Sequence, residues 1–352
     1  MVSKKTIWRI HSWLGLIAGI PLLVIAFSGS VLVYKDELNA LLIPEKTSVD
    51  PVGGKPLPLG ERLDAAQDRL PEYVIVGWAI YRDSERSDFL YVIRRGEREW
   101  LHAYQDPYTG QILSEPAKAT SDIMGWLLSL HFELLAGATG MAVNGILAIV
   151  LCMLGASGLI LYRKFWKNLF TLRLRTSLRL LSGNLHRRIG VISAPVFLIL
   201  GLTGAYWNIT EVLHHVKGEH AEPRVTEPAY ASDVPLERML GNAEEAIPGY
   251  RLRYVDFPRN ADRPITFYGE SEEATPFRSP YHNTVSYDAQ SGALIDHHRM
   301  DNATLWRQLV DAFTPLHFGT FGGHVSRVIW CVLGFAPGLL AISGFIVWCK
   351  RR

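Results

Sequence analysis

The chain has 352 residues, of which 48% are hydrophobic and 20% are charged, and its formal net charge is +2 at pH 7. Length alone would favour two soluble domains. Four stretches about as long as a bilayer crossing contain no Asp, Glu, Lys or Arg, however, and they exclude a wholly soluble protein: 13–34, 142–162, 189–209 and 328–349.

Residues 1–34 are predicted to form the first transmembrane helix. Their apolar run is longer than the roughly 7–15 residues of a signal-peptide core, and no small-x-small cleavage site follows it. We therefore expect this segment to be retained as a membrane helix. His11 lies near the N-terminal end of the segment, just before the charge-free run.

Residues 35–120 are predicted to form a small α+β domain outside the membrane. A helix-like stretch, ERLDAAQDRLPEY, is followed by the β-rich runs YVIVGWAIY and DFLYVIRR. Four aromatic residues of this segment could contact a bulky ligand, although we expect them to fill the core of the β domain: Trp78, Tyr81, Trp100 and Tyr104.

Residues 121–165 are predicted to form an interfacial leader and the second transmembrane helix. His131 lies in the leader, 11 residues before the charge-free run begins. A continuous helix would carry this histidine about 16 Å beyond the run, at roughly 1.5 Å per residue, but the intervening AGATG can break the helix. We therefore expect the leader to fold along the membrane interface, with His131 pointing back toward the helices.

A basic connector follows at residues 166–188. Eight Lys and Arg residues and no acid lie between positions 163 and 188, and both ends of the chain are also basic. This excess of Lys and Arg predicts that the connector and both ends are cytoplasmic. All 34 acidic residues lie in the segments 35–141 and 210–327, which are expected on the opposite side. The connector is typical of a topology determinant that contacts lipid headgroups, so we expect no nucleic-acid partner.

The second half of the chain repeats this order. It has a third transmembrane helix at 189–212, a second α+β domain at 213–302, and a leader with a fourth transmembrane helix at 303–352. Equivalent residues lie at constant offsets of 175 or 186: His11 and His186, Gly29 and Gly204, His131 and His317. The predicted fold is an α-helical membrane protein with four transmembrane helices in two parallel pseudo-two-fold repeats, plus two small α+β exported domains.

Four of the twelve histidines occupy these equivalent positions. A two-fold axis brings equivalent residues face to face when they lie near it, and ionisable groups at membrane depth tend to be functional. Two facing imidazoles can supply both axial ligands of a haem iron. We therefore regard His11 with His186, and His131 with His317, as candidate haem ligands; structural zinc is less favoured, because it prefers four protein ligands.

The remaining histidines and the cysteines give weaker signals. His324, His214 or His215 could replace a member of the His131–His317 pair. Five further histidines are expected to face solvent in the exported domains: His102, His220, His282, His297 and His298. Three cysteines lie in predicted membrane helices: Cys152, Cys331 and Cys349. They form no CxxC motif and are expected to be apolar packing residues.

The segments IHSWLGL…FSGSVLVY, LHRRIGV…LTGAYW and LHFGTFGG…ISGFIVWCKRR resemble the PepSY-associated transmembrane family, over nearly the whole chain. Members are bacterial inner-membrane proteins, and some are siderophore reductases that bind haem. The resemblance implies PepSY-like periplasmic domains and two haem b groups. It also implies that four histidines of this chain match the recurrent histidines of the family: His11, His131, His186 and His317.

The resulting hypothesis is an oxidoreductase of the ferric-siderophore reductase type, embedded in the lipid bilayer of the inner membrane. A ferric siderophore or similar chelate would be reduced at the periplasmic face. The longest cytoplasmic segment has about 26 residues, too few for a nucleotide-binding domain, so the electron donor would be a quinol or a cytoplasmic or membrane reductase. The alternative is a non-enzymatic, membrane-anchored PepSY module that senses or regulates a peptidase or partner protein.

Overall fold

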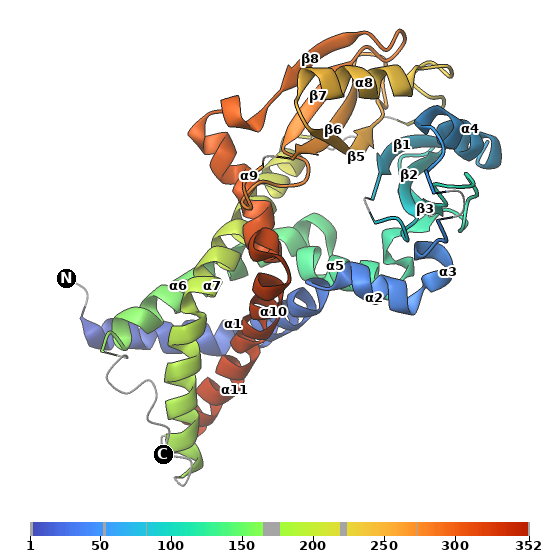
Figure 1. Cartoon of the computed structure of the whole chain (residues 1–352). Coiled ribbons are helices and arrows are strands. Elements are labelled where there is room, and N and C mark those ends of the chain that lie inside the picture. The colour runs from blue at the N-terminus through green and yellow to red at the C-terminus, as the bar shows by residue number, and fades with distance from the viewer. Residues whose placement is uncertain are drawn as a thin grey trace. The chain divides into compact units, whose positions relative to one another are not determined.

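A computed structural model describes residues 3–51, 54–81, 83–164, 177–218, 224–272 and 274–350. The chain divides into two compact units (Figure 1). The helical unit consists of Met1–Lys35, Ile123–His220 and Pro315–Arg352, and the sheet unit consists of Asp36–Asp122 and Ala221–Thr314.

The helical unit contains four helices that are long and apolar enough to cross a membrane, as the sequence predicted. Three are α1 (Lys4–Leu32), α6 (Gly137–Leu161) and α7 (Leu178–Val216). The fourth candidate span, Thr320–Cys349, combines a short 3-10 turn, η4 (Thr320–Gly322), with α10 (Gly323–Gly334) and α11 (Ala336–Cys349). The helices extend beyond the charge-free runs, because backbone hydrogen bonding continues through charged residues that can reach water.

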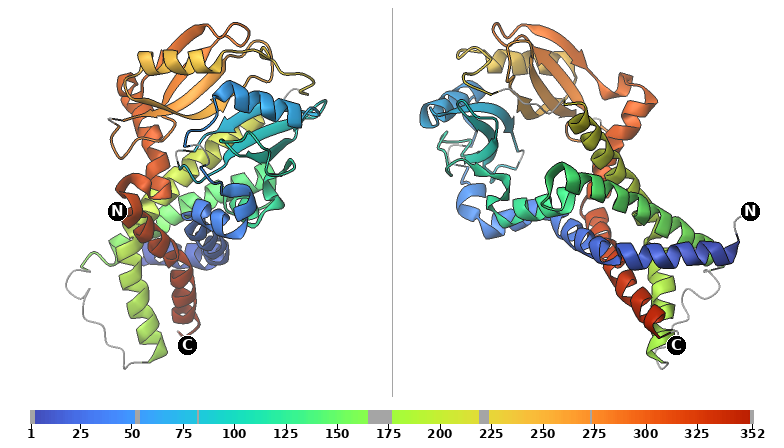
Figure 2. Two further views of the ribbon diagram at one scale, coloured as in Figure 1. Left: turned by 45° about the vertical axis from the view of Figure 1, so that its right-hand side comes forward. Right: turned by 180° about the vertical axis from the view of Figure 1, so that it is seen from behind.

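These helices pack in a ring in which α1 and α7 each contact both α6 and α11. Figure 2 shows α1 running beside α6. Small residues allow the close approach: a Cβ added at Gly201 would lie 2.6 Å from Cys152 Sγ, and one at Gly19 would lie 3.3 Å from Ala341 Cβ. The three cysteines are unpaired and lie in α6, α10 and α11.

The two leaders are short helices, α5 (Ile123–Glu133) and α9 (Leu305–Phe318). In the second half Gly319 and Gly323, both with positive φ, break the chain as expected. In the first half the break begins earlier than AGATG: Leu134 and Leu135 adopt φ of 51° and 58°. Left-handed backbone costs a residue with a Cβ about 1–2 kcal/mol, so the first break is strained and the second is not.

The sheet unit contains one eight-stranded antiparallel sheet in the order β4-β3-β2-β1-β5-β6-β7-β8. Its first four strands are β1 (Tyr73–Ala79), β2 (Asp88–Arg94), β3 (Trp100–Gln105) and β4 (Ala117–Lys118). Its last four are β5 (Tyr250–Asp256), β6 (Ile265–Ser271), β7 (Asn283–Tyr287) and β8 (Leu294–His298). The prediction of two separate α+β domains is therefore corrected: β1 pairs with β5, and this pairing joins the strands of both segments.

Helices α4 (Leu59–Arg69) and α8 (Leu236–Ala246) contact each other and the sheet. Helix α4 occupies the position of the predicted helix-like stretch ERLDAAQDRLPEY. Short helices α2 (Lys35–Leu42) and α3 (Pro44–Thr47) precede α4, and short 3-10 turns, η1 (Ala119–Ser121) and η3 (Met300–Asn302), follow β4 and β8.

The apolar core of the sheet unit lies between the sheet and these two helices. Trp78 is fully buried there, and its indole Nε1–H donates to Asp88, which also pairs with Arg62 at 2.6 Å. Burial raises the pKa of the Asp88 carboxyl to about 6 despite that partner. Tyr104 is also buried, so the core assignment is confirmed for Trp78 and Tyr104, while Tyr81 and Trp100 are only partly buried.

Two histidines that were expected to face solvent are instead buried. His102 stacks on Phe89 with ring centroids 4.9 Å apart, and His282 lies between the Ser279 carbonyl and the Ser271 hydroxyl. The prediction was wrong for both. His102 lies in β3 and is buried against Phe89 of β2, whereas His282 directly precedes β7 and is buried by its contacts with the two serines. His220 and the first part of the predicted connector, residues 166–176, lie outside the described residues.

Candidate functional site

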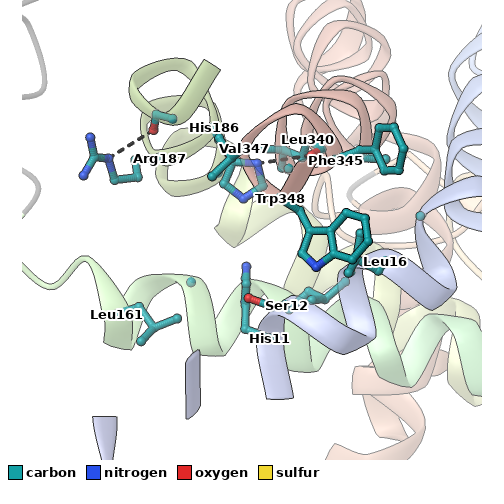
Figure 3. A pocket seen from close by; sticks show the side chains of 18 of the residues that line it. His11, Ser12, Leu16, Leu161, His186, Arg187, Leu340, Phe345, Val347 and Trp348 are labelled. Carbon is teal, nitrogen blue, oxygen red and sulfur yellow. Dashed lines mark hydrogen bonds between the residues drawn. The ribbon is translucent and has the colours of Figure 1, made fainter. Parts of the chain in front are cut away.

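The first histidine pair lies between α1 and α7. His11 of α1 and His186 of α7 point toward each other across a cavity, as Figure 3 shows, and their ring centroids are 6.3 Å apart. The rings are nearly perpendicular, at 85°. The structure therefore brings together two histidines that are 175 positions apart in the sequence.

The second pair lies where the leaders meet the helical unit. His131 of α5 and His317 of α9 also have ring centroids 6.3 Å apart, with an interplanar angle of 60°. Each leader folds back at its break, as predicted, so that its histidine reaches the spanning helices: His131 contacts α1 and His317 contacts α7. Burial, and for His317 also the neighbouring His131, lowers the pKa of both rings, that of His317 to about 3.

The two pairs are far apart along the spanning helices. Ser28, which contacts His131, lies 17 residues after His11 on the same helix α1. At roughly 1.5 Å per residue this separates the pairs by about 25 Å along the helix axis, most of a hydrocarbon core of about 30 Å. One pair therefore lies near each end of the apolar part of the unit.

In two of the four histidines a backbone carbonyl shows which ring nitrogen carries the proton. Nδ1 of His131 is 2.9 Å from the Ile25 carbonyl oxygen, and Nδ1 of His186 is 3.1 Å from the Leu340 carbonyl oxygen. A carbonyl can only accept a hydrogen bond. Nδ1 is therefore the donor in both rings, and the lone pair is on Nε2.

The other two histidines reach the same state through hydroxyl groups. The Ser157 hydroxyl lies 2.7 Å from Nδ1 of His11, and the Thr203 hydroxyl lies 2.7 Å from Nδ1 of His317. Both hydroxyls donate their proton to a carbonyl one turn earlier in their own helix, at 2.6 Å and 2.8 Å. They are left to accept from Nδ1, so these rings also present an Nε2 lone pair.

Every histidine of the two pairs packs against a hydroxyl residue followed by glycine. Ser28–Gly29 holds His131, Ser157–Gly158 holds His11, Thr203–Gly204 holds His317, and Ser343–Gly344 holds His186. The glycine leaves space for ring carbon Cε1: a Cβ there would lie 3.7 Å from His11, 3.6 Å from His317, 3.2 Å from His186 and only 2.5 Å from His131. Sequence reasoning missed these hydroxyl partners, although the recurring Ser/Thr–Gly dipeptides were visible signals.

The cavity around the His11–His186 pair has a volume of about 670 Å³, within the range of cofactor pockets. Its walls are mostly Gly, Leu, Val and aromatic side chains. Three cationic residues line it, Lys4, Arg179 and Arg187, and the described residues that line it include no acid. The site is thus an apolar slot with a positive rim.

Aromatic side chains enclose the second pair. The ring of Trp207 lies 5.0 Å from that of His317, and Phe318 lies 5.8 Å from it. Asn144 of α6 donates to the backbone carbonyls of His131 and Phe132, which ties the end of α5 to the spanning helices. These contacts hold the leaders in the positions that bring His131 and His317 together.

The alternative histidines lie outside both pairs. His324 packs against Tyr34, with ring centroids 5.8 Å apart, and His214 and His215 are exposed at the end of α7. Over the described ranges no group of three or more His, Cys, Asp or Glu is positioned to bind a metal ion. The candidate ligands are therefore two pairs of histidines. Two protein ligands are the number that a metal needs when a macrocycle supplies its other ligands.

The spacing of the rings in both pairs fits the two axial ligands of a haem iron. Imidazole nitrogen lies about 2 Å from a bound metal ion and about 1.2 Å from the centre of its own ring, so two rings on opposite sides of one metal have centres about 6.4 Å apart. The observed 6.3 Å meets that requirement in both pairs. Metal-bound histidines also donate from their other nitrogen to a carbonyl or similar group, as all four Nδ1 atoms do here.

Comparison with known proteins identifies a family that matches nearly the whole chain and a relative that matches part of it. Residues 8–351 match the family described as PepSY-associated TM region. An uncharacterized protein of Pseudomonas aeruginosa, PA4219, is 25% identical over 253 residues, which is 64% of this chain and 63% of that protein. The chain thus spans a little under two thirds of the length of this curated relative.

Proposed function

The chain belongs to the PepSY-associated TM region family, and from this premise we propose that it is a haem-containing electron-transfer protein of the bacterial inner membrane. In this proposal it reduces a ferric siderophore or another ferric chelate at the periplasmic face and so releases Fe(II). The observation that carries the proposal is the presence of two facing histidine pairs, each with 6.3 Å between ring centroids and each with Nδ1 engaged as a donor.

Each pair would hold one haem b, with His11 and His186 as one set of axial ligands and His131 and His317 as the other. When bound there, haem supplies a one-electron redox centre. The chain contributes the ligand geometry, the proton position on each imidazole and an apolar surrounding. Because the pairs lie near opposite ends of α1, they support electron transfer across most of the bilayer.

The orientation follows from the basic residues. The excess of Lys and Arg near both ends of the chain and in the connector favours the cytoplasm for these segments. The His11–His186 pair would then lie on the cytoplasmic side, and the His131–His317 pair and the sheet unit on the periplasmic side. We further propose that the chain is a parallel duplication whose two halves each supply one PepSY-like set of four strands to the shared sheet.

The substrate would be a ferric chelate that accepts one electron near the His131–His317 pair. Fe(II) has a lower charge than Fe(III) and binds hard oxygen ligands more weakly, so reduction favours release of the metal. Of the four aromatic residues considered as chelate contacts, Trp78 and Tyr104 belong to the core, and Tyr81 and Trp100 are partly buried. Arginine stacks on both, Arg86 over Tyr81 at 3.7 Å and Arg259 over Trp100 at 4.9 Å. The electron donor would be a quinol or a partner reductase.

A reduced-minus-oxidised absorption spectrum of the detergent-purified full chain tests this proposal, together with quantitation of haem per chain. We expect the bands of six-coordinate haem b and two haems per chain. A well-expressed, folded preparation without haem bands would refute the proposal and leave the alternative, a membrane-anchored PepSY module, which needs no paired histidines.

A further inference from the structure

Two cations occupy matching positions on α1 and α7. Each lies about two helical turns before the histidine that its helix contributes to the His11–His186 pair. Lys4 precedes His11 by seven residues on α1, and Arg179 precedes His186 by seven residues on α7. Seven residues make about two turns, or roughly 10 Å, so each cation lies on the same helix face as its histidine. Both side chains line the same cavity as the two imidazoles.

The match extends to the register of the two helices. The offset between Lys4 and Arg179 is 175, the same as between His11 and His186. The same correspondence between α1 and α7 therefore relates Lys4 to Arg179 and His11 to His186. A ligand that fills the cavity between the two imidazoles would meet one cation from each helix at its cytoplasmic edge.

Haem has a matching distribution of charge. It carries two propionate carboxylates along one edge. Each propionate extends well away from the iron, just as each cation lies well away from the histidine on its helix. We propose that Lys4 and Arg179 each bind one propionate of a haem held by His11 and His186, which fixes the edge of the porphyrin that faces the cytoplasm. This inference rests on the proposed function, since it requires haem in this cavity.

A general preference for cations at the cytoplasmic end does not account for this arrangement. Lys5 and Arg9 lie on the same part of α1 and serve topology equally well, yet they are not among the residues that line the cavity. Within the described part of the chain, neither Lys4 nor Arg179 has an acidic partner or a side-chain hydrogen bond. Arg187 also lines the cavity, but its guanidinium already donates to the Gly183 carbonyl and to Asn184 Oδ1.

Lipid phosphate offers the same anionic oxygen atoms, so the experiment must separate the two sources. Lys4→Gln and Arg179→Gln would be made in a full-length His317→Ala background, in which only the His11–His186 pair should load. Lys5→Gln and Arg9→Gln are controls, because each removes a positive charge from the N-terminal end of α1 without taking one from the lining of the cavity. Each apoprotein would be titrated in detergent with haem and, in parallel, with haem dimethyl ester, whose carboxylates are blocked.

With haem, we expect Lys4→Gln and Arg179→Gln each to weaken binding roughly two- to fivefold, the range for a solvent-exposed ion pair, and the double variant to show the product of both effects. With the dimethyl ester, the variants should bind as the background protein does. Equal losses with both porphyrins would assign the cations to lipid or to a general field and overturn the inference. Losses no larger than those of Lys5→Gln and Arg9→Gln would also overturn it. Failure of the background protein to bind haem at all would instead count against the proposed function.

Discussion

The two histidine pairs share one local design but differ in what surrounds it. In both, ring centroids lie 6.3 Å apart and a Ser/Thr–Gly dipeptide holds each ring. The His11–His186 pair, however, belongs to two spanning helices and opens into a cavity of about 670 Å³. The His131–His317 pair sits on short leaders, and His131 presses directly on Gly29. The Ser/Thr–Gly dipeptide thus orients each histidine ring, and the packing of the neighbouring backbone determines how large a substitution each site can tolerate.

The independence of the two sites is tested by removing one ligand from each. His131→Ala should strongly weaken haem binding at the His131–His317 pair, because that pair then keeps only one of its two axial ligands, and so should leave one firmly bound haem per chain. His11→Ala should do the same for the other pair. Haem per chain and the redox titration of the remaining absorption bands measure the result. Loss of both haems from either variant, or of neither, would contradict the pairing.

The difference in packing predicts unequal effects of the same substitution. Gly29→Ala places a Cβ 2.5 Å from His131 Cε1, whereas Gly158→Ala places one 3.7 Å from His11 Cε1, an ordinary contact. The first should displace the ring, cost about 1–3 kcal/mol of stability and lower the haem content at the His131–His317 pair. The second should keep both haems. Equal tolerance of the two alanines, measured by haem content and thermal unfolding, would remove the proposed distinction.

Within each pair the number of hydrogen-bond acceptors also differs. His186 has two acceptors at Nδ1, Ser343 Oγ and the Leu340 carbonyl, but the only acceptor found for His11 among the described residues is Ser157 Oγ. Loss of such an outer partner typically costs about 10–100-fold in metal affinity. Ser157→Ala should therefore weaken haem binding about tenfold or more, and Ser343→Ala only a few-fold. Apoprotein titration measures both, and the reverse order would show that the carbonyl does not orient His186.

Much of this site could be predicted from the sequence because its signals are local or periodic. Charge-free runs identified the four spanning helices, and a constant offset paired His11 with His186 and His131 with His317. The β-rich runs likewise identified β1 and β2. Each of these features can be recognised in the sequence, either within one segment or by aligning the two halves of the chain.

The features that were missed depend on contacts between distant segments. The pairing of β1 with β5 joins strands more than 170 positions apart, and neither strand carries a mark of its neighbour. The burial of His102 depends on Phe89 of the neighbouring strand β2, and that of His282 depends on Ser271 of β6. The break at Leu134 and Leu135 departs from the glycine pattern because Asn144 and the His131 contacts hold α5 in place and offset the local strain.

That strain gives the smallest and most specific prediction. Leu135 is 45% exposed and has φ of 58°, so Leu135→Gly removes little packing. It relieves about 1–2 kcal/mol of left-handed strain against a glycine entropy cost of about 0.5–1 kcal/mol. Leu128 is similarly exposed, at 39%, but lies inside α5 with ordinary helical backbone. Leu128→Gly should therefore cost about 1 kcal/mol, while Leu135→Gly leaves stability unchanged or raises it by up to about 1 kcal/mol.

Thermal unfolding of the two variants beside the parent chain, in the same detergent, measures this difference. A glycine already occupies the equivalent bend of the second half at Gly319, where φ is 71°. Leu135→Gly would make the first bend resemble the second without touching either ligand. Equal destabilisation by Leu135→Gly and Leu128→Gly would mean that the first leader stores no backbone strain. The tight fit of His131 against Gly29 would then be the remaining structural difference between the two leaders.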